Sequence, residues 1–351
     1  MKKIILTGGG SAGHVVPNLA LLPTLEKIFD EIHYIGSLNG IEKDIISSYP
    51  KIKYHGIPAV KLKRSLTPKN LLVPFKLISS TIRAKKIIKK ISPNVMFSKG
   101  GFVSVAPAFA AAIQKVPIIS HESDFSIGLA NKLIYKVSKV MCFSFLPLAK
   151  KHKKGVFSGS PIRHEIFAGD KQKVITTHKL STIKTNLLIM GGSLGAVAIN
   201  KVVRDALANL LEKYNVIHIV GKNNIDKKFD RKDYVQIEYT NDIHDYLACA
   251  DIIISRAGSN SIFEFLALNK PMILIPLPKN ASRGDQLVNA NHFKELGYAE
   301  VITQENLTKR SLIEKINELN KTKQKYISNM KKASTTNAID IIINEIKKVM
   351  R

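Results

Sequence analysis

Residues 255–266 of the chain read SRAGSNSIFEFL and directly follow the apolar run DIII at residues 251–254. The apolar run predicts a buried strand, and the periodic apolar residues after the small-residue turn predict an amphipathic helix. Such a turn leaves backbone N–H groups and hydroxyls at a helix N-terminus, where the helix dipole favours an anion. Residues 251–268 therefore predict a strand, a turn and a helix with a candidate anion site.

Glu264 lies one to two turns into this helix, too far along to cap its start. A carboxylate beside a phosphate-binding turn is a suitable hydrogen-bond acceptor for the two hydroxyls of a ribose. A surface glutamate on an ordinary strand–helix unit explains the position equally well. From this stretch alone, both interpretations stay open.

The pattern of strand, glycine turn and helix also begins each half of the chain. Residues 3–7 are followed by Gly8-Gly9-Gly10-Ser11-Ala12-Gly13-His14, and residues 186–190 by Gly191-Gly192-Ser193-Leu194-Gly195-Ala196. Halves that start alike predict an α/β protein of two similar, doubly wound domains. We place the domains at residues 1–160 and 161–335, and we expect the last helix, 336–351, to pack back on the first domain.

Apolar runs predict the remaining strands of both domains, near residues 32–36, 95–97, 117–122, 140–143, 155–157, 216–221, 235–239 and 272–276. In a parallel sheet the carboxyl ends of the strands share one edge, where open α/β folds bind ligands. Asp124 or Ser126 is expected to cap the helix that begins near Ile127. The polar stretch 169–185 has no period and predicts an irregular connection.

The first glycine loop satisfies GxGxxG with Gly8, Gly10 and Gly13, which alone is weak evidence for a dinucleotide site. Such a site also needs an acidic residue at the end of the second strand, and here that strand is followed by SLN at residues 37–39. A phosphate or pyrophosphate site remains. His14 follows the loop directly; a lone histidine is usually solvated, but this position favours a polar role such as that of a base.

The net charge of +27 is unevenly distributed. Residues 1–164 hold 26 of the 54 basic residues but only 7 of the 27 acidic ones, and no acidic residue lies between Ile45 and His121. Nucleic acid is one partner that such a charge suggests, but the chain contains no recognisable nucleic-acid-binding module. The asymmetry favours an anionic surface or substrate at the N-terminal half.

Residues 61–90 mix basic and apolar side chains, and Pro68 and Pro74 are expected to stop a long helix there. A solvated basic helix with one core face explains residues 79–90. The apolar patch before them is better explained as a surface for anionic lipid headgroups: Leu71, Leu72, Val73 and Phe75, flanked by Lys69 and Lys76. No apolar run is long enough to span a membrane and no signal peptide is recognisable, so we expect a cytoplasmic protein.

Seven motifs, in order along nearly the whole chain, resemble those of the MurG family of glycosyltransferases. They are residues 9–14, 99–104, His121-Glu122 with Asn131-Lys132, 159–163, 191–196, 255–266, and Asp285-Gln286 with Asn289-Ala290. The resemblance implies two Rossmann-like domains facing a cleft, the GT-B fold. It also implies transfer of N-acetylglucosamine (GlcNAc) from UDP-GlcNAc to lipid I, undecaprenyl-pyrophosphoryl-MurNAc-pentapeptide. The product, lipid II, is used in peptidoglycan synthesis.

The resemblance also implies roles for individual residues. His14 would be the catalytic base, and Gly10, Gly100 and Gly101 would receive the pyrophosphate of the acceptor. The donor would be bound by Ser11, Ala12, Gly13, Asp124, Arg163, Ser193, Thr240, Ser259, Asn260, Ser261, Glu264 and Gln286. Within this set, Glu264 would contact the ribose hydroxyls, and Asp124 stands where relatives often have asparagine.

The implied chemistry is an inverting displacement in which a base takes the proton of the acceptor's 4-hydroxyl while UDP leaves. The sequence contains no DxD pair, so we expect neither a metal nor another cofactor. The implied partners are UDP-GlcNAc, lipid I, an anionic membrane surface at the cytoplasmic face, and cell-wall synthesis or division proteins. The alternatives are another GT-B lipid glycosyltransferase, a UDP-sugar epimerase, and a non-catalytic nucleotide-sugar-binding protein.

Overall fold

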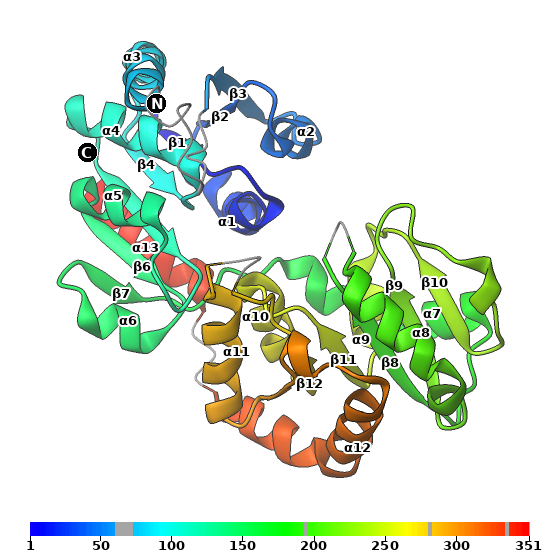
Figure 1. Ribbon diagram of the computed structural model, residues 1–351. Helices are drawn as coiled ribbons and strands as arrows, with labels where there is room; N and C mark the ends of the chain where they lie inside the picture. Colours follow the sequence, from blue (N-terminus) through cyan, green and yellow to red (C-terminus); the bar gives the residue numbers. More distant parts are fainter. Residues whose placement is uncertain (60–72, 193–194, 280–282, 334–336, 351) are drawn as a thin grey trace. The chain divides into compact units, whose positions relative to one another are not determined.

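A computed structural model of the chain describes residues 1–59, 73–192, 195–279, 283–333 and 337–350. The chain forms two compact units. Unit 1 consists of Met1–Arg163 together with Thr335–Arg351, and unit 2 of His164–Ser334. Each unit contains one parallel sheet with helices on both faces, so the described chain is an α/β protein (Figure 1).

The sheet of unit 1 has the strand order β3-β2-β1-β4-β5-β6-β7. Its strands are β1 (Lys3–Thr7), β2 (Glu31–Ser37), β3 (Ile52–Ile57), β4 (Val95–Ser98), β5 (Ile118–Glu122), β6 (Val140–Phe143) and β7 (Gly155–Phe157). The strand order reverses between β1 and β4, which pair directly. Ligands of doubly wound folds bind at such a switch point, outside the carboxyl ends of the strands.

Successive residues of β1 point to opposite faces of this sheet and begin two separate cores. Ile4 and Leu6 pack with α1 (Val16–Leu25) and with α13 (Ala338–Val349), and Ile5 packs with α3 (Val73–Ile91) and α4 (Val105–Ile113). Figure 1 shows α13, in red, lying against the strands of unit 1. Helix α13 therefore contributes to the same core as the first strand and the first helix of the chain. The remaining helices of unit 1 are α2 (Ile41–Ser47), α5 (Leu129–Val137) and α6 (Leu146–Lys151).

Unit 2 repeats the same arrangement, with the strand order β10-β9-β8-β11-β12-β13. Its strands are β8 (Thr185–Met190), β9 (Tyr214–Ile219), β10 (Tyr234–Ile237), β11 (Ile252–Ser255), β12 (Met272–Leu274) and β13 (Ala299–Val301). Its helices are α7 (Lys171–His178), α8 (Val197–Leu211), α9 (Ile243–Cys249), α10 (Ser259–Ala267), α11 (Asp285–Glu295) and α12 (Lys309–Lys331). The switch point lies between β8 and β11, which is where the stretch 255–266 leaves the sheet.

Three local predictions are wrong. Residues 169–185 contain helix α7, whose first N–H groups are capped by the Asp170 carboxylate. Pro74 does not stop a helix, because it lies in the first described turn of α3, where a proline costs no hydrogen bond. Helix α5 follows Gly128 rather than a capping Asp124 or Ser126, and the N–H of Gly128 donates to the Glu122 carboxylate at 3.0 Å.

Candidate active site

Two loops meet at the switch point of unit 1: residues 8–14 after β1 and residues 99–101 after β4. His14 ends the short 3-10 helix η1 (Ala12–His14). A Cβ on Gly101 would lie 2.9 Å from the Cδ2 atom of His14 and 2.3 Å from the carbonyl oxygen of Gly9, so a larger residue does not fit. The φ of Gly101, +82°, also favours glycine. His14 is thus packed against the second glycine turn. The two loops are neighbours because the carboxyl ends of the parallel strands β1 and β4 lie at the same edge of the sheet.

The backbone after β4 also orients the imidazole of His14. Its Nδ1 atom lies 3.3 Å from the carbonyl oxygen of Lys99, which accepts a hydrogen bond only from a protonated Nδ1. In the neutral ring the lone pair then lies on Nε2. A histidine fixed in this tautomer can take a proton through Nε2.

Glu42 on α2 holds the first glycine loop from beneath, and the sequence analysis missed it. Its carboxylate is fully buried and accepts hydrogen bonds from the N–H of Gly10 at 3.1 Å, from the N–H of Ser37 at 2.9 Å and from the Ser37 hydroxyl. Burial alone would raise the pKa of Glu42, but the bonds from Ser37 and Gly10 lower it below its ordinary value. Because the N–H of Gly10 already has this acceptor, a phosphate at the loop must use other donors. The only sequence signal was an acid five residues beyond β2.

The loop after β5 carries Asp124, next along the same edge. The Glu122 carboxylate organises this loop by accepting from the N–H of Asp124 at 3.1 Å, from Gly128 and from the Asn131 amide at 3.0 Å. Lys99, with a relative exposure of 1%, extends beneath the loop and donates to the Ser123 hydroxyl. Asp124 therefore lies on a rigid support in unit 1.

Helix α10 begins at the switch point of unit 2, directly after Gly258, which has no side chain to cap it. Apart from its chain neighbours, no atom of the described residues lies within 4 Å of where a Cβ on Gly258 would be, so among these residues the approach to the helix N-terminus is open. Ser259, Asn260 and Ser261 form the first turn, and the half-buried Glu264 lies in the second. This geometry suits an anionic group at the turn with a carboxylate one turn farther on.

Arg256 fixes the neighbouring loop, and its role was not predicted. Its guanidinium donates to the carbonyl oxygens of Ile275 at 3.1 Å and Pro276 at 3.3 Å, and to the Gln304 side chain at 2.7 Å. Gln286 holds the same loop, because its Oε1 atom accepts from the N–H of Leu277 at 3.0 Å. The amide nitrogen of Gln286 is then the group with which it can donate to a sugar.

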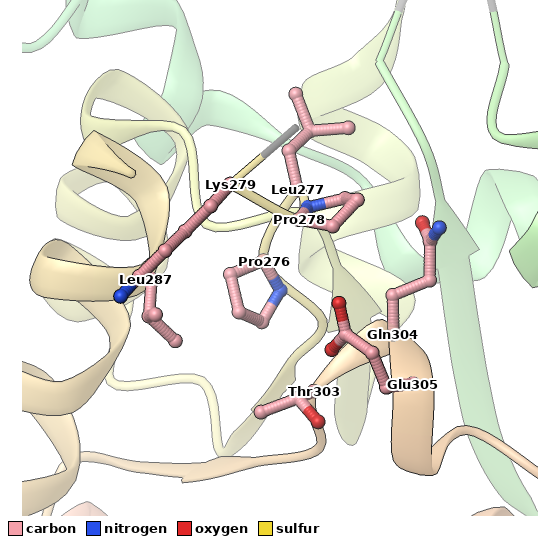
Figure 2. A pocket seen from close by; sticks show the side chains of 8 residues that line it. All are labelled: Pro276, Leu277, Pro278, Lys279, Leu287, Thr303, Gln304 and Glu305. Carbon is pink, nitrogen blue, oxygen red and sulfur yellow. The ribbon is translucent and has the colours of Figure 1, made fainter. Parts of the chain in front are cut away.

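A pocket of about 290 Å³ opens beside this loop. Figure 2 shows the residues that line it: Pro276, Leu277, Pro278 and Lys279 from the loop, Leu287 from α11, and Thr303, Gln304 and Glu305. Arg256 and Gln286 hold residues 275–277, which follow β12, in place. The pocket therefore adjoins, but does not contain, the predicted sugar-binding side chain of Gln286.

The predicted donor residues are divided between the two units. Ser11, Ala12, Gly13 and Asp124 lie along the carboxyl edge of the sheet of unit 1, and Arg163 is the last residue of the first segment of that unit. Thr240 follows β10 in unit 2, where its hydroxyl accepts from the N–H of Asp242 at 3.0 Å. Ser193 lies outside the described residues.

The predicted membrane residues are only partly described. Val73, Phe75 and Lys76 lie in the first turn of α3, and Phe75 is 71% exposed. Lys69, Leu71 and Leu72 lie outside the described residues. The exposed face of α3 continues with Ile78 and Ile82, 58% and 53% exposed, which the sequence analysis did not single out.

The described residues contain no group of three or more His, Cys, Asp or Glu that could hold a metal ion. Cys142 and Cys249 are free and buried. Burial raises the pKa of Cys249 to about 11, so its thiol stays protonated at neutral pH.

Family models match both units. The Glycosyltransferase family 28 N-terminal domain matches residues 4–142, and the Glycosyltransferase family 28 C-terminal domain matches residues 186–345. Among solved structures, Acinetobacter baumannii MurG superposes with a TM-score of 0.78 at 22% identity, covering 99% of this chain and 100% of that one. A UDP-GlcNAc 2-epimerase from Neisseria meningitidis superposes with a TM-score of 0.68 at 14% identity, covering 99% and 100%. The fold is therefore that of GT-B glycosyltransferases, which an epimerase shares.

Curated relatives are much closer in sequence. Proteins of Clostridium novyi and Clostridium tetani are 51% and 47% identical to this chain, each over 99% of the chain and 98% of the relative. Both are named UDP-N-acetylglucosamine--N-acetylmuramyl-(pentapeptide) pyrophosphoryl-undecaprenol N-acetylglucosamine transferase. The chain accordingly belongs to the MurG family of N-acetylglucosaminyltransferases, within glycosyltransferase family 28.

Proposed function

We propose that the chain transfers GlcNAc from UDP-GlcNAc to the 4-hydroxyl of the MurNAc sugar of lipid I, with inversion at the anomeric carbon, and so produces lipid II. The observation that carries this proposal is the match, at 51% identity over 99% of the chain, to a relative named for that transfer. The carboxyl edges of both sheets carry loops suited to it. Unit 1 supplies a base, and unit 2 supplies an open helix N-terminus for an anionic leaving group.

In this proposal His14 is the general base. The Lys99 carbonyl directs the lone pair to Nε2, and a neutral imidazole at that position can take the proton of the acceptor's hydroxyl as the new bond forms. At position 101 only glycine fits beside the imidazole ring of His14, because a Cβ there would be too close to the ring. The acceptor's pyrophosphate would lie at Gly100 and Gly101, beside this base.

The donor's UDP would be bound by the start of α10 in unit 2. The N-terminus after Gly258 faces the diphosphate, and Glu264 accepts hydrogen bonds from the ribose hydroxyls one turn farther on. The negative charge on departing UDP would be stabilised by backbone N–H groups and helix dipoles. We expect no divalent metal in this step, because the sequence contains no DxD pair.

We further propose that the exposed face of α3 binds the cytoplasmic surface of the membrane that contains lipid I. Phe75, Ile78 and Ile82 are spaced as one helical stripe, and the exposed Lys86 and Lys89 continue the same face. Apolar side chains with basic neighbours suit insertion among anionic headgroups. None of the described helices is long and apolar enough to cross a membrane. Cell-wall synthesis or division proteins stay predicted partners at this surface.

A coupled assay of UDP release tests the enzymatic proposal. Purified enzyme is given several UDP-sugars, each with and without a short-chain analogue of lipid I, and the product is identified by mass. We expect UDP release only with UDP-GlcNAc plus acceptor, and a disaccharide lipid as product. Conversion of UDP-GlcNAc to an epimer without acceptor would favour the epimerase alternative, and binding without turnover would favour the non-catalytic one.

A further inference from the structure

Glu42 is a fully buried carboxylate at the carboxyl edge of the sheet of unit 1. It comes from the first turn of α2, the helix that follows β2. One of its oxygens accepts from the N–H of Gly10 at 3.1 Å, and the other accepts from the N–H of Ser37 at 2.9 Å and from the Ser37 hydroxyl. The carboxylate thus joins the loop after β1 to the last residue of β2.

Three glycines surround the Glu42 side chain and leave no room for another one. A Cβ on Gly9 would lie 2.7 Å from the carboxyl carbon of Glu42. A Cβ on Gly36 or on Gly40 would lie 2.9 Å from its Cγ atom or 2.5 Å from its Oε1 atom, respectively. Heavy atoms that are not bonded do not pack so closely, so these positions accept only glycine while Glu42 is present. The backbone of the site is therefore shaped around this one side chain.

The carboxylate makes the contact that a phosphate would make at this loop. Glycine loops bind phosphates through backbone N–H groups, and here the N–H of Gly10 donates to an anion of the chain itself. Burial opposes ionisation, but the hydrogen bonds from Ser37 and Gly10 lower the pKa of Glu42 below its ordinary value, so the group is charged at neutral pH. A phosphate at Gly10 would have to displace this carboxylate against the repulsion of its charge.

The peptide group between Gly9 and Gly10 connects Glu42 with the surroundings of His14. Its N–H donates to Glu42, and its carbonyl oxygen lies against Gly101, 2.3 Å from where a Cβ would be. The imidazole of His14 lies against the same residue, with its Cδ2 atom 2.9 Å from that position. Because a peptide group is planar and rigid, the carboxylate sets the direction of both of its ends. Glu42 therefore fixes the backbone beside which the imidazole is packed.

We propose that Glu42 is a positioning residue for the transfer reaction: its carboxylate fixes the first glycine loop beside His14 and keeps the acceptor's pyrophosphate away from Gly10. This proposal rests on the proposed function, in which His14 is the base. The first glycine loop then holds the base, and the second turn, at Gly100 and Gly101, is left for the pyrophosphate. Loss of the carboxylate should lower kcat, whereas damage to a phosphate-binding loop would raise the KM for the acceptor.

Glu42→Gln tests this role in the full-length enzyme, because the amide has the shape of the carboxylate but accepts at only one end. With its oxygen toward the two donors of Ser37, its NH₂ group faces the N–H of Gly10, donor against donor. We expect kcat to fall about tenfold or more, since misplacing a catalytic group by about 1 Å can cost about 100-fold. The KM for a short-chain acceptor should stay near the wild-type value. A raised acceptor KM with unchanged kcat, or wild-type values of both, would overturn the proposal.

Asp30→Asn is the matched control at the opposite edge of the same two strands. The Asp30 carboxylate accepts from the N–H of Lys2 at 2.6 Å, and these residues directly precede β2 and β1. It therefore joins the two strands as Glu42 does, but at their amino ends, away from the site. D30N should leave kcat and the acceptor KM unchanged; a fall in kcat equal to that of E42Q would show a general effect of loosening β1 and β2, and would overturn the specific role of Glu42.

A titration of the wild type with inorganic pyrophosphate provides a second test, which does not depend on the folding of a variant. In protein labelled with ¹⁵N-glycine, pyrophosphate should shift the amide resonance of Gly101 and leave that of Gly10 in place. In E42Q the Gly10 resonance should shift as well, since its N–H has lost the carboxylate. A shift of Gly10 in the wild type as large as that of Gly101 would overturn the proposal. A wild-type enzyme without GlcNAc transfer would instead refute the proposed function, whatever this titration shows.

Discussion

Gly258 precedes helix α10, at the turn where we propose that the diphosphate of the donor binds. Among the described residues a methyl group there would contact only its chain neighbours within 4 Å, and the φ of Gly258, −68°, suits any residue. Gly258→Ala should therefore leave the free energy of unfolding unchanged or raise it by about 0.5 kcal/mol. If a diphosphate lies against this turn, the same change should weaken UDP binding at least about tenfold, because the backbone can no longer be approached closely.

The measurement is titration calorimetry with UDP, together with a thermal melt. Gly192 is the control, since a Cβ there would also meet no atom of the described part of the chain beyond its neighbours within 4 Å, but its φ of +92° disfavours alanine. Gly192→Ala should lower the melting temperature. Unchanged UDP affinity in the Gly258 variant would place the diphosphate elsewhere.

His14 has a matched control in the same unit. Replacing His14 by alanine should lower kcat by about 100-fold or more, as loss of a general base does, with the KM for UDP-GlcNAc little changed. His152 makes the same kind of bond, from Nδ1 to the carbonyl oxygen of Leu148 at 2.8 Å, but lies before β7, away from the carboxyl edge. His152→Ala should leave kcat near the wild-type value. Comparable kcat for both variants would remove His14 as the base.

At the scale of elements, helix α3 provides the membrane prediction. Phe75→Glu should weaken binding to vesicles that contain phosphatidylglycerol, and binding by the wild type should fall with salt, since the headgroup attraction is screened. Turnover of a short-chain, water-soluble acceptor should stay unchanged. Ile183→Glu is the control, because Ile183 is 94% exposed but belongs to unit 2. Equal binding of the wild type to neutral vesicles would argue against an electrostatic surface.

The sequence predicted the interior elements well and the peripheral ones poorly. Strands β1, β4 and β11 are continuous apolar runs because both of their faces are covered by helices. The edge strand β3 reads IKYHGI, with only its two ends buried, and β13 has three residues, so neither shows the same signal. The glycine turns were placed correctly because they follow the buried strands.

The supports of the candidate site were less visible in the sequence. Glu42 and Arg256 act through contacts with residues distant along the chain, Gly10 and Gln304 among them. Lys99 stands directly before a glycine turn in the sequence, but its burial depends on the loop after β5, which no local pattern reveals. Motifs therefore predict where a ligand binds, while the packing beneath determines which side chains are held there.

At the scale of the whole molecule, the core of unit 1 depends on a helix from the far end of the chain. Ile342 and Ile346 of α13 are fully buried with Leu22 and Leu25 of α1. Ile342→Ala should cost about 2–5 kcal/mol, the usual effect of truncating a buried isoleucine. Hydrogen exchange should then accelerate in β1, β4 and β5, while β8 and β11 keep their protection.

The matching variant in unit 2 is Ile316→Ala, since Ile316 of α12 is fully buried in the core that α12 forms with α8 and the sheet. It should show the reverse pattern, with faster exchange in β8 and unchanged exchange in β1. Equal acceleration in both units after either substitution would show that the two cores unfold together.

The position of α13 also determines the order in which the two units can complete their folding during synthesis. Unit 2 is continuous along the chain, so it can fold as soon as residues 164–334 have left the ribosome. Unit 1 waits for its last core residues until α13 has been made, although its strands are made first. During translation the nascent enzyme would therefore complete the unit proposed to bind the nucleotide before the unit proposed to face the lipid. The surface proposed to bind the membrane would mature only after α13 has joined this core.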